Sequence, residues 1–179
     1  MSGKVLIIST SMRKNGNSDA LADAFLQGAE ESGNVVEKIS LADKTIGFCK
    51  GCLACQRTKK CVIRDDANAI VEKIRTADAI VFATPVYYYE MSGQMKTLLD
   101  RANPLFSSDY AFRDIYLLTT AADSEDGTDA RVISGLEGWI ECFPKAELAG
   151  RVFAGGVSDV GEIKGHAALK QAYELGKSL

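Results

Sequence analysis

The sequence predicts an α/β fold in which a doubly wound, five-stranded parallel sheet carries helices on both faces. Short apolar runs alternate with segments of helical periodicity along the whole chain. The clearest run, residues 79–84, is apolar at every position before its last threonine, which is typical of a central strand buried on both faces. At 179 residues the chain fits a single domain, residues 1–179, with a substantial core.

The first third of the chain contains two expected strands and a helix between them. Residues 4–10 form the first strand, and the helix that follows places Leu21 and Phe25 on one apolar face. The Val and Ile content of residues 35–41 predicts the second strand. The next segment, about residues 42–64, is longer than most connections, so we interpret it as an insertion in the domain with a functional role.

The rest of the chain continues the alternation of helices and strands. Asp65 and Asp66 can cap a helix that precedes the strand at residues 79–84. Pro85 is expected to end that strand, and Ser92 can cap the following helix. The elements expected after that helix are a strand at residues 114–120, a helix at 128–143, a strand at 151–157 and a helix at about 166–178.

Charge and hydropathy exclude several classes of partner. The formal net charge is −3 and no long basic run is present, which argues against a nucleic-acid partner. No apolar run approaches the roughly 18 to 20 residues of a membrane helix. The first apolar run, residues 5–8, is also too short for the core of a signal peptide. We therefore expect a cytoplasmic protein without a membrane partner.

In a doubly wound sheet, ligands bind outside the carboxyl ends of the strands, so the turns after the strands are the places to search. The turn after the first strand contains Ser11, Arg13, Asn17 and Ser18, and all four can donate hydrogen bonds to a phosphate at the start of a helix. An ordinary strand-to-helix loop capped by Asn17 or Ser18 is the alternative interpretation.

Two further turns suit a flat ring. Residues 87–89 are three adjacent tyrosines, which cannot all be buried because successive side chains diverge. Exposed aromatic side chains at this edge can flank a planar ligand, although a packing or dimer-contact loop is the alternative. After the strand at residues 114–120, the small residues Ala121 and Ala122 allow a ligand to approach the backbone. A phosphate-bearing planar heterocycle fits all three turns, and flavin mononucleotide (FMN) is the leading candidate.

Other cofactor and catalytic patterns are missing from the sequence. No G-x-G-x-x-G follows any expected strand, which disfavours a Rossmann dinucleotide domain. No Ser-His-Asp or Cys-His arrangement can be built around the single histidine, His166, which we expect to be structural or exposed. Because a flavin supplies its own hydride chemistry, we assign no catalytic residue.

The motifs resemble those of a known family. Residues 10–18, TSMRKNGNS, resemble the phosphate loop G-S-P-R-x-x-G-N-T/S of the flavodoxin-like NAD(P)H-dependent FMN reductases. Residues 83–96 are similar to that family's flavin-ring loop and following helix. Thr10 and Met12 depart from the Gly and Pro of the pattern, which changes the backbone path but keeps the donors. The specific similarity runs from residue 4 to about residue 103, and a looser one continues to the C-terminus.

The resemblance implies a flavodoxin-like fold with strand order 2-1-3-4-5, non-covalent FMN, and a homodimer or homotetramer. It gives the phosphate role to the first turn and the ring role to Pro85, Val86, Tyr87 and Tyr88. The full set of candidate cofactor-binding residues is Ser11, Arg13, Asn15, Asn17, Ser18, Pro85, Val86, Tyr87, Tyr88, Thr120, Ala121 and Ala122.

Four of the five cysteines, Cys49, Cys52, Cys55 and Cys61, lie within 13 residues. The spacing x2, x2, x5 is closer to that of ferredoxin [4Fe–4S] ligands than to the paired knuckles of zinc sites. It is also similar to the compact cysteine motif of the iron–sulfur flavoprotein branch of the family. Free or reversibly oxidised thiols are the alternative, because the neighbouring lysines and Arg57 favour thiolates as well as a negatively charged cluster. The fifth, Cys142, is expected to be a buried small hydrophobic residue.

These observations predict an FMN-dependent oxidoreductase that transfers a hydride from NAD(P)H to a flat acceptor such as a quinone, a nitro- or azo-aromatic compound or free flavin. The alternative is an electron carrier that contains FMN and a [4Fe–4S] cluster and serves ferredoxin-type partners. A flavin-bound thiol sensor that uses the cysteine loop is a weaker third hypothesis.

Overall fold

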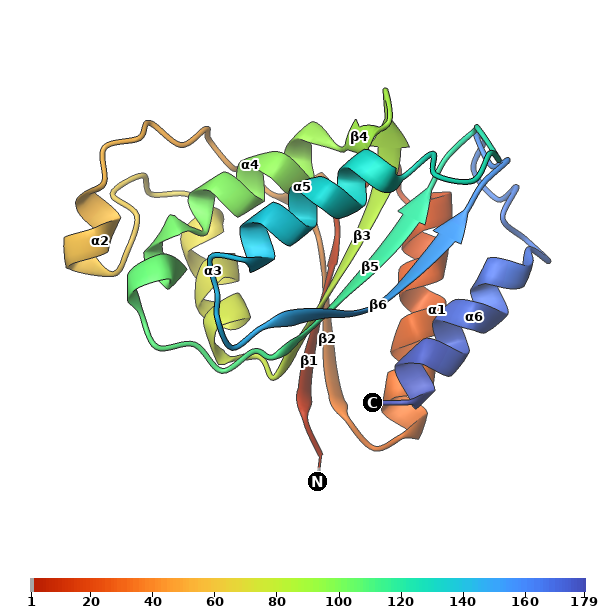
Figure 1. Ribbon diagram of the computed structural model, residues 1–179, viewed down its shortest axis with the longest axis horizontal. Helices are drawn as coiled ribbons and strands as arrows, with labels where there is room; N and C mark the ends of the chain where they lie inside the picture. The colour runs from red at the N-terminus through yellow and green to blue at the C-terminus, as the bar shows by residue number, and fades with distance from the viewer. Residues whose placement is uncertain (1) are drawn as a thin grey trace.

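Five parallel strands form the central sheet in the order β2-β1-β3-β5-β6, as the computed structural model of residues 2–179 shows (Figure 1). A short sixth strand, β4, pairs antiparallel with the end of β3. The strands are β1 (Lys4–Ser9), β2 (Val35–Ser40), β3 (Ala79–Tyr87), β4 (Glu90–Met91), β5 (Asp114–Thr120) and β6 (Glu147–Ala154). Because β4 lies off the main path, the order of the parallel strands confirms the predicted flavodoxin-like order 2-1-3-4-5.

Helices cover both faces of this sheet. The α-helices are α1 (Asn17–Glu31), α2 (Ala54–Thr58), α3 (Ala67–Thr76), α4 (Gly93–Arg101), α5 (Ala130–Ile140) and α6 (Ala167–Lys177), and the 3-10 helices are η1 (Leu41–Asp43) and η2 (Asn103–Ser107). In Figure 1, α1 and α6 lie on one side of the sheet and α3, α4 and α5 on the other. No helix in residues 2–179 is both long enough and apolar enough to cross a membrane.

Alternate residues of the strands fill two separate cores. On one face, Ile8 and Phe82 are buried beneath Met95 of α4 and Leu136 of α5. On the other face, Ile7 and Val81 pack under α1 and α6. Strands that are apolar toward both faces are expected where helices cover both sides of a parallel sheet. The packing on both faces therefore holds the strands, and with them the carboxyl ends of the strands, in place.

Several predicted boundaries were wrong. Strand β3 does not end at Pro85 but continues to Tyr87, because proline fits an extended backbone and loses only one donor at the end of a ladder. The strand predicted at residues 151–157 occupies Glu147–Ala154. Its first half contains Gly150, which weakens the strand pattern in the sequence but accepts the close approach of Leu175 and Tyr116.

The prediction for Cys142 was also wrong. Helix α5 ends at Ile140 rather than at residue 143, so the helical face on which Cys142 was placed does not extend that far. Cys142 lies in the following turn and is exposed. Ser92, by contrast, caps α4 as predicted, since its Oγ accepts a hydrogen bond of 3.2 Å from the Met95 N–H. Asp65 contributes to the start of α3, where its Oδ1 accepts from the Ala67 N–H.

Candidate functional site

A cavity of about 230 Å³ lies at the carboxyl ends of β1, β3 and β5. The three turns that the sequence singled out all line it. Ten of the twelve candidate residues are among its walls, and they are Ser11, Arg13, Asn17, Ser18, Pro85, Val86, Tyr87, Thr120, Ala121 and Ala122. Asn15 and Tyr88 are not part of this lining. The fold therefore brings together predicted residues that are up to 111 positions apart, from Ser11 to Ala122.

The wall formed by the segment after β6 was not predicted. Gly16 and three residues of that segment, Val157, Ser158 and Val160, complete the lining. The structural reason is Asn17. Its Nδ2 donates to the Asp159 carbonyl at 3.0 Å, and its Oδ1 accepts from the N–H groups of Gly161 and Ile163. The buried Asn17 amide thus holds the segment beside the first turn.

The start of α1 offers unpartnered N–H groups to the cavity. The first bond within the helix runs from the Ala20 N–H to the Gly16 carbonyl at 3.0 Å, so helix geometry leaves the N–H groups of the three preceding residues without an intrahelical acceptor. Gly16, the N-cap, makes no side-chain cap. This end of the helix is therefore open to an anion.

Arg13 and Ser18 of the first turn, like Asn17, are also engaged by protein groups. Arg13 Nη1 donates to the Ser158 carbonyl at 2.7 Å, which leaves its other donors available. The Ser18 hydroxyl shares a 2.7 Å hydrogen bond with that of Thr120, so the phosphate turn is tied to the end of β5. Backbone N–H groups and Arg13 are therefore the donors best placed for an anion, while Asn17 and Ser18 shape the walls.

The tyrosine turn has an unusual backbone. Tyr88 and Tyr89 have φ values of 50° and 66°, and they link β3 to β4 as the two central residues of a tight hairpin. Left-handed residues in such a turn are normally Gly, Asn or Asp, and other side chains cost about 1 kcal/mol or more each. Tyr88 is 97% exposed, and Tyr87 and Tyr89 are each about half exposed. The prediction that these rings could not all be buried is confirmed, and the strained turn directs them outward.

Hydroxyl groups fix the first and second turns to each other. The Thr10 and Ser92 hydroxyls share a buried hydrogen bond of 2.9 Å. The Thr84 hydroxyl in turn accepts from the Ser92 N–H at 3.2 Å. The third turn is held by backbone contacts, since the Ala121 N–H donates to the Ala154 carbonyl at 3.0 Å. The cavity walls are thus fixed relative to one another.

His166 takes no part in this site. It is the N-cap of α6, and its Nδ1 accepts from the Ala168 N–H at 3.1 Å. The expectation of a structural role for this residue is confirmed. The cavity lining therefore contains no imidazole.

Helix α2 of the cysteine loop lies near the end of α4 that is remote from β4 (Figure 1). Cys49 and Cys52 are exposed, Cys61 is partly buried and Cys55 is buried. Within residues 2–179, no three His, Cys, Asp or Glu side chains form a group that could hold a metal ion. Helix α2, which the sequence did not predict because it has only five residues, carries Cys55.

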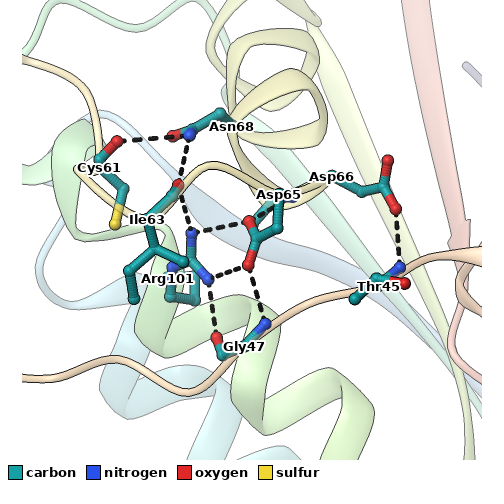
Figure 2. A network of polar contacts seen from close by, with 9 residues as sticks. Thr45, Gly47, Cys61, Ile63, Asp65, Asp66, Asn68 and Arg101 are labelled. Carbon is teal, nitrogen blue, oxygen red and sulfur yellow. Dashed lines mark hydrogen bonds and ion pairs between the residues drawn. The ribbon is translucent and has the colours of Figure 1, made fainter.

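A buried ion pair anchors this loop. The Arg101 guanidinium is fully buried and donates to both carboxylate oxygens of Asp65, at 2.6 and 2.8 Å. Figure 2 shows that it also reaches the carbonyls of Gly47 and Ile63, so it joins both arms of the loop to α4. Burial alone raises the pKa of Asp65, but hydrogen bonds from Arg101 and the Gly47 N–H outweigh it and hold that pKa below its usual range.

Comparison with known proteins identifies the family of the chain. A family model described as NADPH-dependent FMN reductase matches residues 3–133. An iron-sulfur flavoprotein of Methanosarcina thermophila is 30% identical over 156 residues, which cover 87% of this chain and 82% of the relative. An iron-sulfur flavoprotein of Archaeoglobus fulgidus is 41% identical over 101 residues, which cover 56% of this chain and 46% of the relative. The chain thus spans only about half the length of that relative.

Solved structures show the same fold. An NAD(P)H:quinone oxidoreductase from Methanothermobacter marburgensis superposes with a TM-score of 0.78 at 18% identity, covering 99% of this chain and 96% of the other. At this level of identity the likeness establishes the fold, and the function has to be argued from the cavity and the cysteine loop.

Proposed function

Since the chain belongs to the NADPH-dependent FMN reductase family, we propose that it is an FMN-dependent oxidoreductase that oxidises NAD(P)H and reduces a flat acceptor. Quinones, nitro- or azo-aromatic compounds and free flavin are the acceptors considered. The proposal rests on one observation: the start of α1, the tyrosine turn after β3 and the small-residue turn after β5 all line the same cavity. Bound FMN would supply the hydride chemistry itself.

The first turn fits the phosphate of FMN. A Cβ added to Gly16 would come within 3.1 Å of the Arg13 carbonyl and 3.2 Å of Ser11 Oγ, so the turn is closed around a residue without a side chain. This leaves the N–H groups at the start of α1 unobstructed. Arg13 adds a positive charge at the rim, where it can bind a phosphate oxygen with the donors that Ser158 does not use.

The second and third turns fit the flavin ring. Pro85, Val86 and Tyr87 present a wall at the end of β3, and Ala121 and Ala122 leave the opposite backbone accessible. Protein N–H and C=O groups at such a wall can hydrogen-bond the polar edge of a planar ring while aromatic side chains cover its face. The chain's own task is thus to bind and orient the cofactor and to admit nicotinamide and acceptor.

We also propose that the active form is a homodimer or homotetramer. The cavity of about 230 Å³ is smaller than the roughly 300 to 1,000 Å³ usual for a pocket that encloses a cofactor-sized ligand. Tyr87 lines it, and the exposed rings of Tyr88 and Tyr89 follow in the same turn. A second copy packed against these rings would complete the enclosure of the flavin.

The proposal is tested by titrating FMN into cofactor-free protein and following the quenching of flavin fluorescence. The loaded protein is then mixed with NADPH or NADH and a soluble quinone under anaerobic conditions, and the loss of nicotinamide absorbance is recorded. We expect saturable binding of about one FMN per chain and acceptor-dependent oxidation. A protein that binds no FMN would contradict the proposal.

A second candidate function is favoured by the cysteine loop. Several curated relatives bear the name iron-sulfur flavoprotein, and the four cysteines of the loop form no disulfide. The chain would then carry a [4Fe–4S] cluster beside FMN and exchange electrons with ferredoxin-type proteins. Iron and sulfide analysis of anaerobically purified protein decides between the two functions. Loss of iron in Cys55→Ala but not in Cys142→Ala would support the carrier.

A further inference from the structure

The proposed reaction uses a dinucleotide that the flavin cavity cannot enclose. That cavity measures about 230 Å³, which is below the roughly 300 to 1,000 Å³ usual for one cofactor-sized ligand. The nicotinamide ring of NAD(P)H has to reach the flavin in order to pass on its hydride. The adenosine half of the molecule therefore has to lie outside this cavity, on another part of the protein surface.

A second cavity, of about 280 Å³, adjoins the same turn of the chain. Met12 lines it, whereas the neighbours of Met12 in the chain, Ser11 and Arg13, line the flavin cavity. Because consecutive Cα atoms are only about 3.8 Å apart, the two cavities meet at this turn. The two halves of a dinucleotide are joined by a flexible pyrophosphate, so one molecule can occupy both cavities.

The lining of the second cavity suits a purine. Phe48 is 81% exposed and Met12 is 49% exposed, so both offer apolar surface to a flat ring. Leu41 and Ile46 add aliphatic surface. Gln94 carries an amide that can both donate to and accept from the polar edge of a purine. An apolar lining with a few polar groups is typical of a small-molecule site.

Lys44 adds a positive charge to this cavity. Among the described residues that line the cavity, it is the only charged one. Its Nζ donates to the exposed Asp43 carboxylate at 3.2 Å, but an ammonium group has three donors and can also bind a ligand. Charge-assisted hydrogen bonds to a phosphate are the strong ones. A 2′-phosphate distinguishes NADPH from NADH, so Lys44 favours NADPH.

The start of α4 leaves the cavity open. Gly93 lines the cavity as the first residue of that helix. A Cβ added to Gly93 would meet no atom within 4 Å, so the space beside it is not filled by the protein. Ser92, directly before it, is held by its hydrogen bonds to Thr10 and Thr84. This wall is therefore fixed, and a larger side chain at residue 93 would extend into free space.

We propose that the second cavity binds the adenosine half of NADPH, with Phe48 against the purine and Lys44 on the 2′-phosphate. The inference rests on the proposed oxidoreductase function and adds the residues that select NADPH over NADH. In this arrangement the flavin cavity determines the rate of hydride transfer, and the second cavity determines the affinity for the dinucleotide.

The first test measures binding without turnover. The full chain, with and without FMN, is titrated calorimetrically with adenosine 2′,5′-bisphosphate and with 5′-AMP. Gly93→Leu places a side chain in the cavity and should weaken the binding of both by about tenfold or more through overpacking. Lys44→Ala should weaken the bisphosphate about tenfold or more and 5′-AMP less, whereas Asp43→Asn frees Lys44 and should strengthen the bisphosphate. The matched control is Gly138→Leu, since a Cβ there also meets no atom within 4 Å.

The second test measures turnover of the FMN-loaded protein with two hydride donors. One is NADPH, and the other is N-benzyl-1,4-dihydronicotinamide, which has the reacting ring but no adenosine. In Gly93→Leu we expect the KM for NADPH to rise about tenfold or more, with no comparable change for the benzyl compound. An equal rise for both donors would overturn the inference.

Equal binding of the bisphosphate by the parent, Gly93→Leu and Lys44→Ala also overturns the inference, as does a parent protein that does not bind it. A changed molecular mass of Gly93→Leu in light scattering, with unchanged nucleotide binding, overturns it as well and makes the cavity a contact between two copies. A parent that binds the bisphosphate but, once loaded with FMN, does not oxidise NADPH contradicts the proposed function and leaves the nucleotide site standing.

Discussion

Arg13 and Lys14 are adjacent cations in different surroundings. Both are exposed, but only Arg13 lines the cavity and donates to the Ser158 carbonyl, whereas Lys14 lies outside the lining. If FMN binds through its phosphate, Arg13→Ala should weaken binding about 10- to 100-fold, the value of a charge-assisted hydrogen bond. Lys14→Ala should change it by less than about twofold, since Lys14 lies outside the lining and solvent screens its charge from a bound phosphate. Fluorescence titration at two salt concentrations measures the FMN affinity of both variants. An equal loss of affinity in the two would mean that only the net charge of the turn matters.

Asp65 and Arg101 are a residue pair whose effect should depend on pH. The pKa of Asp65 is lower in the folded protein than in the unfolded chain, so its stabilising contribution is complete above the unfolded pKa. That contribution is lost as the pH falls through the folded pKa. Asp65→Asn leaves Arg101 buried without its counterion, and removal of one partner of a buried pair costs about 3 to 5 kcal/mol.

We therefore expect Asp65→Asn to be much less stable than the parent at pH 7 and to lose less of its remaining stability between about pH 5 and pH 3, where carboxylates titrate. Urea unfolding across this pH range measures both effects. Asp43→Asn is the control, because Asp43 is exposed and pairs only with its neighbour Lys44. An equally steep pH dependence in Asp65→Asn and the parent would contradict the assignment.

At the scale of elements, α1 and α6 approach each other through two glycines. A Cβ on Gly28 would lie 2.0 Å from the Tyr173 carbonyl oxygen, and one on Gly176 would lie 2.1 Å from that of Phe25. Gly28→Ala should therefore destabilise the protein by about 1 to 3 kcal/mol through overpacking. Gly138→Ala on α5 has open space around it and should be neutral or stabilising by up to about 1 kcal/mol, because alanine favours helix. Thermal unfolding measures the stability of both variants. Equal stabilities would show that α1 and α6 can move apart at little cost.

The elements that could be predicted from sequence are those whose pattern is local. The strand at residues 79–84 is apolar throughout, and Ser92 stands directly before a helical pattern, so both were found. Helix α2 is only five residues long and has no periodicity to detect. The early start of β6 was hidden by Gly150, whose tolerance depends on Leu175, a residue 25 positions away.

The site shows the same division at the scale of the whole molecule. The three predicted turns follow β1, β3 and β5. Because these strands are parallel, their carboxyl ends, and so the three turns, lie at the same edge of the sheet. The segment after β6 was missed because it is positioned by Asn17, which lies more than 140 residues earlier in the chain. The Arg101–Asp65 pair was missed for the same reason, since no spacing in the sequence indicates which arginine will be buried against which aspartate.

Because the cavity takes its walls from the ends of three strands and from the segment after β6, it exists only in the folded chain. A ligand that binds only the folded state stabilises it by about 2.7 kcal/mol at 100 times its Kd. For a chain of this length that corresponds to a rise in Tm of about 5 to 10 °C. FMN should therefore raise the Tm by this amount, while riboflavin at the same concentration, which lacks the phosphate, should raise it much less. Arg13→Ala should reduce the FMN shift toward that of riboflavin and leave the riboflavin shift unchanged. Equal shifts with FMN and riboflavin in the parent protein would show that the first turn does not bind a phosphate.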